Sequence, residues 1–226
     1  MSYEPPTIVI VQGSFQTPLV YESLRTGLQD AGYPVVHPVL PSCSNVDDAD
    51  FPTRTLNDDA LAVTQAIDEL VQQGKRVVAQ GREGGVVHLF YFAAFILGVG
   101  QSVLGTFGES PNNNITSDGR FTIKNGAEIL YNDLPQQDAK LWESRLIPQS
   151  YLVQSTPLTR AAYEYIPSTY LITENDQAAK SEYQEMFAGT AKAHIERCTA
   201  GHSPMLSQPK MLVKRIAAVA DKVVAI

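Results

Sequence analysis

The 226-residue chain is poor in cysteine and in basic residues, and each shortage excludes a class of protein. Its two cysteines, Cys43 and Cys198, are far apart and have no CxxC spacing, so we expect buried thiols and neither a disulfide framework nor a zinc site. Lysine and arginine number 17 against 24 aspartates and glutamates, and the net charge of −7 provides no basic surface for nucleic acid or an anionic membrane. We predict no metal and no cofactor.

The sequence also lacks a hydrophobic run long enough to span a bilayer. Its most apolar stretch, residues 86–97 (VVHLFYFAAFIL), has about 12 residues, whereas a membrane helix needs roughly 20. The amino terminus has no basic region followed by a signal-length apolar run. We therefore expect a cytoplasmic protein whose partner is a small molecule and not a membrane.

The chain does contain short β-rich apolar runs that alternate with amphipathic helical segments. This alternation is typical of α/β proteins, in which helices flank a mostly parallel sheet. Strands are expected at residues 7–11, 35–36, 76–79, 168–173 and 193–198, and helices at 18–31, 56–73, 179–191 and 207–223. Gly32 and Gly74 are expected just beyond the ends of the first two helices. The length and a hydrophobic content of 44% predict a single domain, residues 1–226.

Residues 109–166 interrupt this rhythm. They contain several prolines and the only tryptophan, Trp142. We interpret the segment as a small cap inserted over a site. Its larger apolar side chains would either line the mouth of a pocket for a small ester, lactone or ketone or form the core of the cap: Phe121, Tyr131, Leu134, Leu141 and Trp142.

Polar loops follow three of the predicted strands, at the sheet edge where open α/β sheets bind ligands. Gly13 permits a sharp turn after which the amides of Ser14 and Phe15 could face a developing oxyanion. Asp176 follows one strand and His202 follows the next, in the order of the acid and the base of a catalytic triad. Asp176 would orient the ring and His202 would act as general base. Alternatively, the aspartate caps a helix and the histidine is an ordinary loop residue.

Longer phrases of the sequence favour the catalytic interpretation. They are TIVIVQGSFQTPLVYESL, AGYPVVHPVLPS, YNDLP, IPSTYLITENDQA and AGHSPMLSQP. Together they resemble small fungal and bacterial members of the α/β-hydrolase superfamily, relatives of plant methyl esterases and hydroxynitrile lyases, over nearly the whole chain. The resemblance implies an α/β-hydrolase fold with a small cap, catalytic residues His202 and Asp176, and an oxyanion loop at Gly13, Ser14 and Phe15. The other histidines match no motif position and are expected to be structural or exposed: His37, His88 and His194.

One part of the family pattern is missing. An α/β-hydrolase presents its nucleophile on a G-x-S-x-G elbow between a central strand and a helix, and no serine or cysteine here occupies such a turn. The nearest string, residues 81–85 (GREGG), places Glu83 at the position of the hydroxyl. A carboxylate would form an anhydride with an ester and would repel the oxyanion. Three serines fall near predicted strand ends, but none is on a strained strand-to-helix turn: Ser14, Ser102 and Ser203.

Two interpretations of the missing elbow remain open. In the first, residues 87–94 form the next parallel strand, and the crossover minimum of roughly 10–12 residues leaves no space for an elbow helix. The resemblance then implies that about 30 residues carrying the serine and its helix are absent. In the second, residues 81–85 are a degenerate elbow and residues 86–97 are the helix behind it. The β-branched and aromatic content favours the strand.

These observations predict an esterase-like member of the family, ancestrally cleaving a small ester or a related C–O or C–C bond, whose hydrolytic activity is impaired. Three alternatives remain: a lyase, isomerase or cyclase that uses His202 and Asp176 alone, a ligand-binding pseudoenzyme, and an exon lost or misread when the gene was predicted. Loss of the elbow helix would also uncover an apolar face of the sheet, so we expect poor solubility or a homodimer.

Overall fold

The computed structural model describes residues 5–75, 77–78 and 85–224, and within them the predicted α/β sheet is confirmed. Its strands are β1 (Thr7–Val9), β2 (Val35–Val36), β3 (Val77–Val78), β4 (Leu89–Phe92), β8 (Ser168–Thr173) and β9 (His194–Cys198). The described pairings group them in the orders β2-β1-β3 and β4-β8-β9. Every one of these pairings is parallel, so the carboxyl ends of β8 and β9 lie side by side.

The central strand β8 is buried along its whole length. Side chains alternate between the two faces of a strand, and a parallel sheet covered on both faces buries both sets. Leu171 belongs to the larger core cluster together with Ile8 and Ile10 of β1 and its following loop. Tyr170 and Ile172 belong to a second cluster. The strand β8 therefore separates two hydrophobic clusters, one on each face of the sheet.

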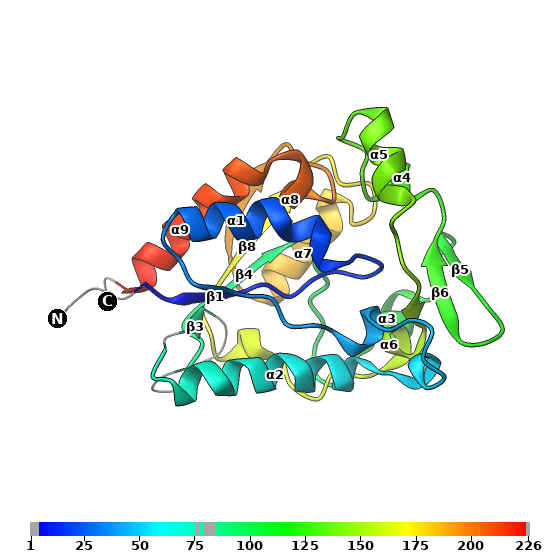
Figure 1. The fold of residues 1–226 in the computed structure, drawn as a ribbon, viewed down its shortest axis with the longest axis horizontal. Helices are drawn as coiled ribbons and strands as arrows, with labels where there is room; N and C mark the ends of the chain where they lie inside the picture. The colour runs from blue at the N-terminus through cyan, green and yellow to red at the C-terminus, as the bar shows by residue number, and fades with distance from the viewer. Residues whose placement is uncertain (1–4, 76, 79–84, 225–226) are drawn as a thin grey trace.

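One face of the sheet is well covered by helices. Figure 1 shows α1 (Glu22–Asp30), α8 (Pro204–Ser207) and α9 (Pro209–Val224) together on this side. Leu28 of α1 and Leu212 of α9 are each 0% exposed, in the core that also contains Leu171. A 3₁₀ turn at Pro18–Tyr21 precedes α1, and Gly32 ends it with a φ of 93°, a conformation that favours glycine.

The opposite face is covered unevenly. The helix α7 (Ser181–Thr190) packs Phe187 and Ala188 into the cluster that contains Tyr170 and Ile172. The longer helix α2 (Leu56–Gln72) runs along the side away from α1 and α9, as Figure 1 shows. It begins with a capping box, but of its 17 residues only Asp59 is buried. The predicted helix is therefore present, and its apolar side chains remain partly or largely exposed.

Residues 109–166 form a separate cluster of short elements, preceded by α3 (Val103–Phe107). Its antiparallel sheet consists of β5 (Asn113–Ile115), β6 (Arg120–Ile123) and β7 (Gln149–Ser150), and its helices are α4 (Gly126–Ile129), α5 (Gln136–Glu143) and α6 (Leu152–Ser155). Figure 1 places α4, α5, β5 and β6 at one end of the molecule. We call residues 109–166 the inserted segment. Phe15 packs into its core, so the segment contacts the loop after β1.

The structure decides part of the question raised by residues 86–97. Leu89–Phe92 forms β4, paired in parallel with β8, and the following residues are not helical, so the interpretation of 86–97 as an elbow helix is wrong. Aromatic side chains favour this extended conformation. Glu83 and the rest of residues 81–84 lie outside the described residues. Among the helices that the structure describes, none has the length and hydrophobicity needed to cross a membrane.

Candidate active site

His202 and Asp176 meet at the carboxyl edge of the sheet. Asp176 follows β8 and His202 follows β9, and because these strands are parallel neighbours their loops emerge together. The imidazole Nδ1 lies 3.1 Å from Oδ1 and 3.0 Å from Oδ2 of the carboxylate. The Asp176 side chain is 0% exposed and that of His202 is 22% exposed. One ring nitrogen is therefore held by a buried carboxylate, and the other ring nitrogen makes no hydrogen bond within the described residues.

The Asp176 carboxylate is held in place by several donors. The amides of Ala178 and Ala179 donate to Oδ1 at 2.8 and 2.9 Å. The Thr173 hydroxyl and the Gln184 side-chain amide donate to Oδ2 at 3.2 and 3.3 Å. These bonds replace the hydration that the carboxylate loses on burial. Gln184, itself 0% exposed, was not identified from the sequence, since a buried glutamine within a helix carries no motif.

No hydroxyl or thiol of the described residues is hydrogen-bonded to Nε2 of His202. Ser203, the next residue, is buried, and its oxygen accepts a hydrogen bond from Gln16 Nε2 at 3.3 Å. Ser102 caps α3 by accepting from the Gly105 amide at 3.1 Å. Ser14 is half-buried on the loop after β1. Of the three serines near strand ends, Ser203 and Ser102 therefore already accept hydrogen bonds from other residues.

The loop after β1 makes a tight turn at Phe15. Phe15 has a φ of 65°, a left-handed conformation that costs a non-glycine residue about 1–3 kcal/mol. The Gly13 amide donates to the Tyr21 hydroxyl at 2.8 Å and is therefore not free for an oxyanion. The Ser14 amide has no partner among the described residues, which leaves it available for a ligand oxygen. Such strain is typical of functional sites.

The aromatic residues expected at the pocket are mostly core. Phe121 and Tyr131 are 1% and 0% exposed and share a cluster with Phe15, whose ring meets Phe121 edge-to-face at 4.9 Å. Burial raises the pKa of Tyr131 to about 12. Trp142 is half-buried, with the Arg145 guanidinium 4.7 Å from its ring centroid. Phe121 and Tyr131 are therefore core residues, which is the second of the two roles that the sequence left open.

The other three histidines make no described contact with His202 or Asp176. His88 Nε2 lies 3.0 Å from the Thr169 hydroxyl, and His37 meets the Tyr21 ring edge-on at 5.2 Å. Burial lowers the pKa of both imidazoles. His194 is exposed. These contacts are structural ones.

The two cysteines are free thiols. Cys43 is buried, accepts a hydrogen bond from Gln149 Nε2 at 3.2 Å, and has its pKa raised by burial to about 11. Cys198 is only half-buried, which differs from the fully buried thiol expected, and burial raises its pKa as well. A thiol with a raised pKa is a weak nucleophile at neutral pH.

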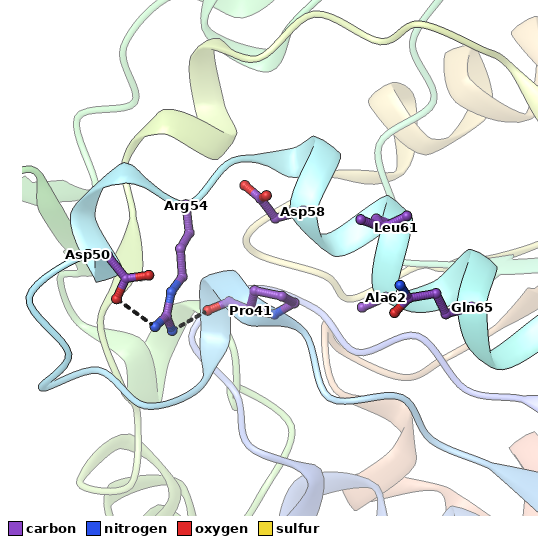
Figure 2. Close-up of a pocket in the computed structure, with 7 residues that line it drawn as sticks. All are labelled: Pro41, Asp50, Arg54, Asp58, Leu61, Ala62 and Gln65. Carbon is purple, nitrogen blue, oxygen red and sulfur yellow. Dashed lines mark hydrogen bonds and ion pairs between the residues drawn. The ribbon is translucent and has the colours of Figure 1, made fainter.

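A hollow at the surface lies beside the start of α2 (Figure 2) and has a volume of about 260 Å³. Its lining residues are Pro41, Asp50, Arg54, Asp58, Leu61, Ala62 and Gln65. Arg54 is already bound to Asp50 at 3.0 Å and to the Pro41 carbonyl at 3.1 Å, so its charge and its donors are engaged. None of the predicted site residues lines this hollow. Within the described ranges, no three histidine, cysteine or acidic residues are grouped to hold a metal ion.

Comparison with known proteins finds sequences similar to this chain. A family model described as "Alpha/beta hydrolase family" matches residues 8–215. The protein "Alpha/beta hydrolase nvfD" of Aspergillus novofumigatus (strain IBT 16806) is 30% identical over 251 aligned positions, which cover 98% of this chain and 99% of that protein. Because the alignment is longer than the 226 residues of this chain, at least 25 positions of the relative have no counterpart here.

Two solved structures have similar folds. A pyrethroid hydrolase from Sphingobium faniae JZ-2 superposes with a TM-score of 0.73 at 18% identity, covering 96% of this chain and 97% of its own. Tomato methylketone synthase I, in complex with 2-tridecanone, superposes with a TM-score of 0.76 at 13% identity, covering 98% of this chain and 100% of its own. At these identities the likeness describes the fold alone.

Proposed function

The chain belongs to the alpha/beta hydrolase family, and we propose that it is an esterase-like member that retains a His–Asp base but lacks the serine for acyl transfer. One observation carries this proposal. The Nδ1 of His202 is held by buried Asp176, while Nε2 makes no hydrogen bond to a hydroxyl or thiol in the described part of the chain. An imidazole held in this way accepts a proton at Nε2, and the carboxylate stabilises the imidazolium that results.

The length of the chain around the missing elbow supports the absence of the serine. Ten residues, 79–88, separate the end of β3 from the start of β4. A parallel crossover connection, including its helix, needs roughly 10–12 residues or more, so these ten residues are at the lower limit for a turn and a helix. The Aspergillus relative has at least 25 positions without a counterpart here, a number large enough for such a unit. The segment that remains contains Glu83 but no serine.

We propose that the ligand is a small, moderately apolar ester, lactone or ketone. The Ser14 amide, which has no partner within the described residues, would hold the ligand's oxygen, whereas the Phe15 amide is bonded to the Cys43 sulfur. The inserted segment would act as a cap, because its core includes Phe15. The cytoplasmic location expected from the sequence stays a prediction.

A lyase, isomerase or cyclase is the second candidate, and the intact pair of His202 and Asp176 favours it over a pure binding protein. A buried carboxylate costs stability unless it is compensated, and here four protein donors compensate it while the fifth contact is the imidazole. Such an arrangement suits proton transfer at carbon or oxygen. One protein of similar fold, from tomato, is named a methylketone synthase and not a hydrolase.

We also propose that the chain forms a homodimer through the side of α2. Leu61 of α2 is 58% exposed, and of the 17 residues of α2 only Asp59 is buried. All four residues of β4 are only half-buried. Such a partly covered apolar side is the place where a second copy would bury surface.

Hydrolysis of 4-nitrophenyl acetate tests the proposed chemistry. We expect no burst of nitrophenol stoichiometric with enzyme, because no acyl-enzyme forms, and any slow turnover should fall by about 10²–10⁴-fold in His202→Ala, the range typical of general-base catalysis. The exposed His194 provides the matched control, so His194→Ala should retain the wild-type rate. A stoichiometric burst, or turnover that His202→Ala leaves unchanged, would contradict the proposal.

A further inference from the structure

The inserted segment reaches both loops of the His–Asp pair through two adjacent residues. Between α4 and α5, the Asp133 carboxylate accepts a hydrogen bond from the Gly201 amide at 2.6 Å, and Gly201 directly precedes His202. The side-chain amide of Asn132 donates to the Asn175 carbonyl at 2.9 Å, and Asn175 directly precedes Asp176. Two neighbouring side chains thus contact the residue immediately before each member of the pair.

The two loops are also bonded to each other, but only in their earlier parts. The Glu174 amide donates to the Cys198 carbonyl at 2.9 Å, and the Asn175 amide donates to the Ala200 carbonyl at 3.1 Å. No backbone bond between the two loops is described beyond Ala200. The Asp133 contact with Gly201 is therefore the last described anchor of the backbone before the His202 ring.

The fit at Gly201 is close. A Cβ added to this glycine would lie 2.8 Å from Asp133 Oδ1 and nearer still to Asn132 Oδ1. Both oxygens are buried and have no hydrogen-bond partner in the described residues. Burying unpaired oxygens is unfavourable, and protein sites tolerate such costs where geometry has to be held.

We propose that Asn132 and Asp133 are positioning residues that fix the His202 loop relative to the Asp176 loop. Asp133 restrains the backbone before the imidazole and Asn132 restrains the backbone before the carboxylate, so the 3.0 Å contact between ring and carboxylate depends on the inserted segment. The inference rests on the proposed function in taking this pair as the working base. Its physical content, the geometry of the ring, is measurable without any turnover.

Nuclear magnetic resonance of the intact chain labelled with ¹⁵N-histidine reads this geometry directly. With four histidines in the sequence, His202→Asn assigns the His202 signals by their disappearance. In the wild type we expect a slowly exchanging Nδ1 proton, because that proton is held by Asp176. In Asp133→Ala the exchange of this proton with water should become about tenfold faster or more, since a hydrogen bond to a charged group is lost beside the ring.

A matched control separates positioning from general loosening of the inserted segment. Glu143 accepts a hydrogen bond from the Ala127 amide at 3.0 Å, which is the same type of contact within the same segment but away from both loops. Glu143→Ala should therefore leave the His202 proton as in the wild type. Asp133→Asn, which retains an acceptor oxygen, should recover much of the protection lost in Asp133→Ala.

Two results would overturn the inference: unchanged exchange in Asp133→Ala, or equal acceleration in Asp133→Ala and Glu143→Ala. If Asp133→Ala does not fold, Asn132→Ala makes the same test from the Asp176 side, where the bond removed lies at the surface. Absence of any turnover would count against the proposed function alone, because the proton exchange is measured without substrate.

Discussion

At the scale of single residues, the site joins groups that are far apart in the sequence. Gln184 contacts Asp176 from a helix, and Asp133 contacts Gly201 across 68 positions of the chain. The sequence indicated Asp176 and His202 because each follows a predicted strand in triad order. It did not indicate Gln184, and it could not place Asp133 relative to His202, because a contact between distant residues leaves no local pattern. The positive φ of Phe15 was likewise invisible, since phenylalanine is not a residue that marks such a turn.

Two half-buried histidines predict how stability depends on pH. Burial lowers the pKa of His88 and His37 below the ordinary value of 6.5. As the pH falls below 6.5, these imidazoles become protonated in the unfolded chain before they do so in the folded one, so the free energy of unfolding should decrease. We expect urea titrations at pH 7 and 5.5 to show this decrease, and His88→Gln to reduce it.

Equal stability of the wild type at pH 7 and 5.5 would contradict the lowered pKa of His88 and His37 in the folded chain.

At the scale of elements, the sequence predicted the positions of helices and strands better than the burial of their side chains. The strand expected at 168–173 is β8, and the helix expected at 56–73 is α2, ending at residue 72. The strand follows from its apolar run, and the helix from its periodicity and from Gly74 beyond its end. The uncovered face of α2 could not be read from its own pattern, because burial depends on what packs against a helix.

The uneven covering predicts different costs for the same substitution in two helices. Leu61 of α2 is 58% exposed, whereas Leu212 of α9 is 0% exposed. Leu61→Ala should change the free energy of unfolding by no more than about 0.5 kcal/mol, and Leu212→Ala should lower it by about 2–5 kcal/mol. Urea unfolding of dilute protein measures both. A cost at Leu61 comparable to that at Leu212 would mean that α2 is covered in solution.

At the scale of the whole molecule, the partly covered side predicts self-association. We expect sedimentation equilibrium to show a concentration-dependent dimer, and Leu61→Glu to shift it toward monomer by placing a charge on the side of α2. A substitution of Leu19, which is 52% exposed on the 3₁₀ turn before α1, provides the control: Leu19→Glu should leave the association unchanged. A monodisperse monomer with cooperative unfolding would contradict the dimer.

The family fold and the His–Asp geometry together make one claim about the whole protein, that a base survives without a serine for it to activate. Fluorophosphonate labelling of the purified 226-residue chain, read by intact mass spectrometry, tests that claim most directly. We predict no adduct on the folded protein, with a serine hydrolase of the same fold labelled in parallel as the positive control. A single adduct on any serine, lost in His202→Ala, would contradict it.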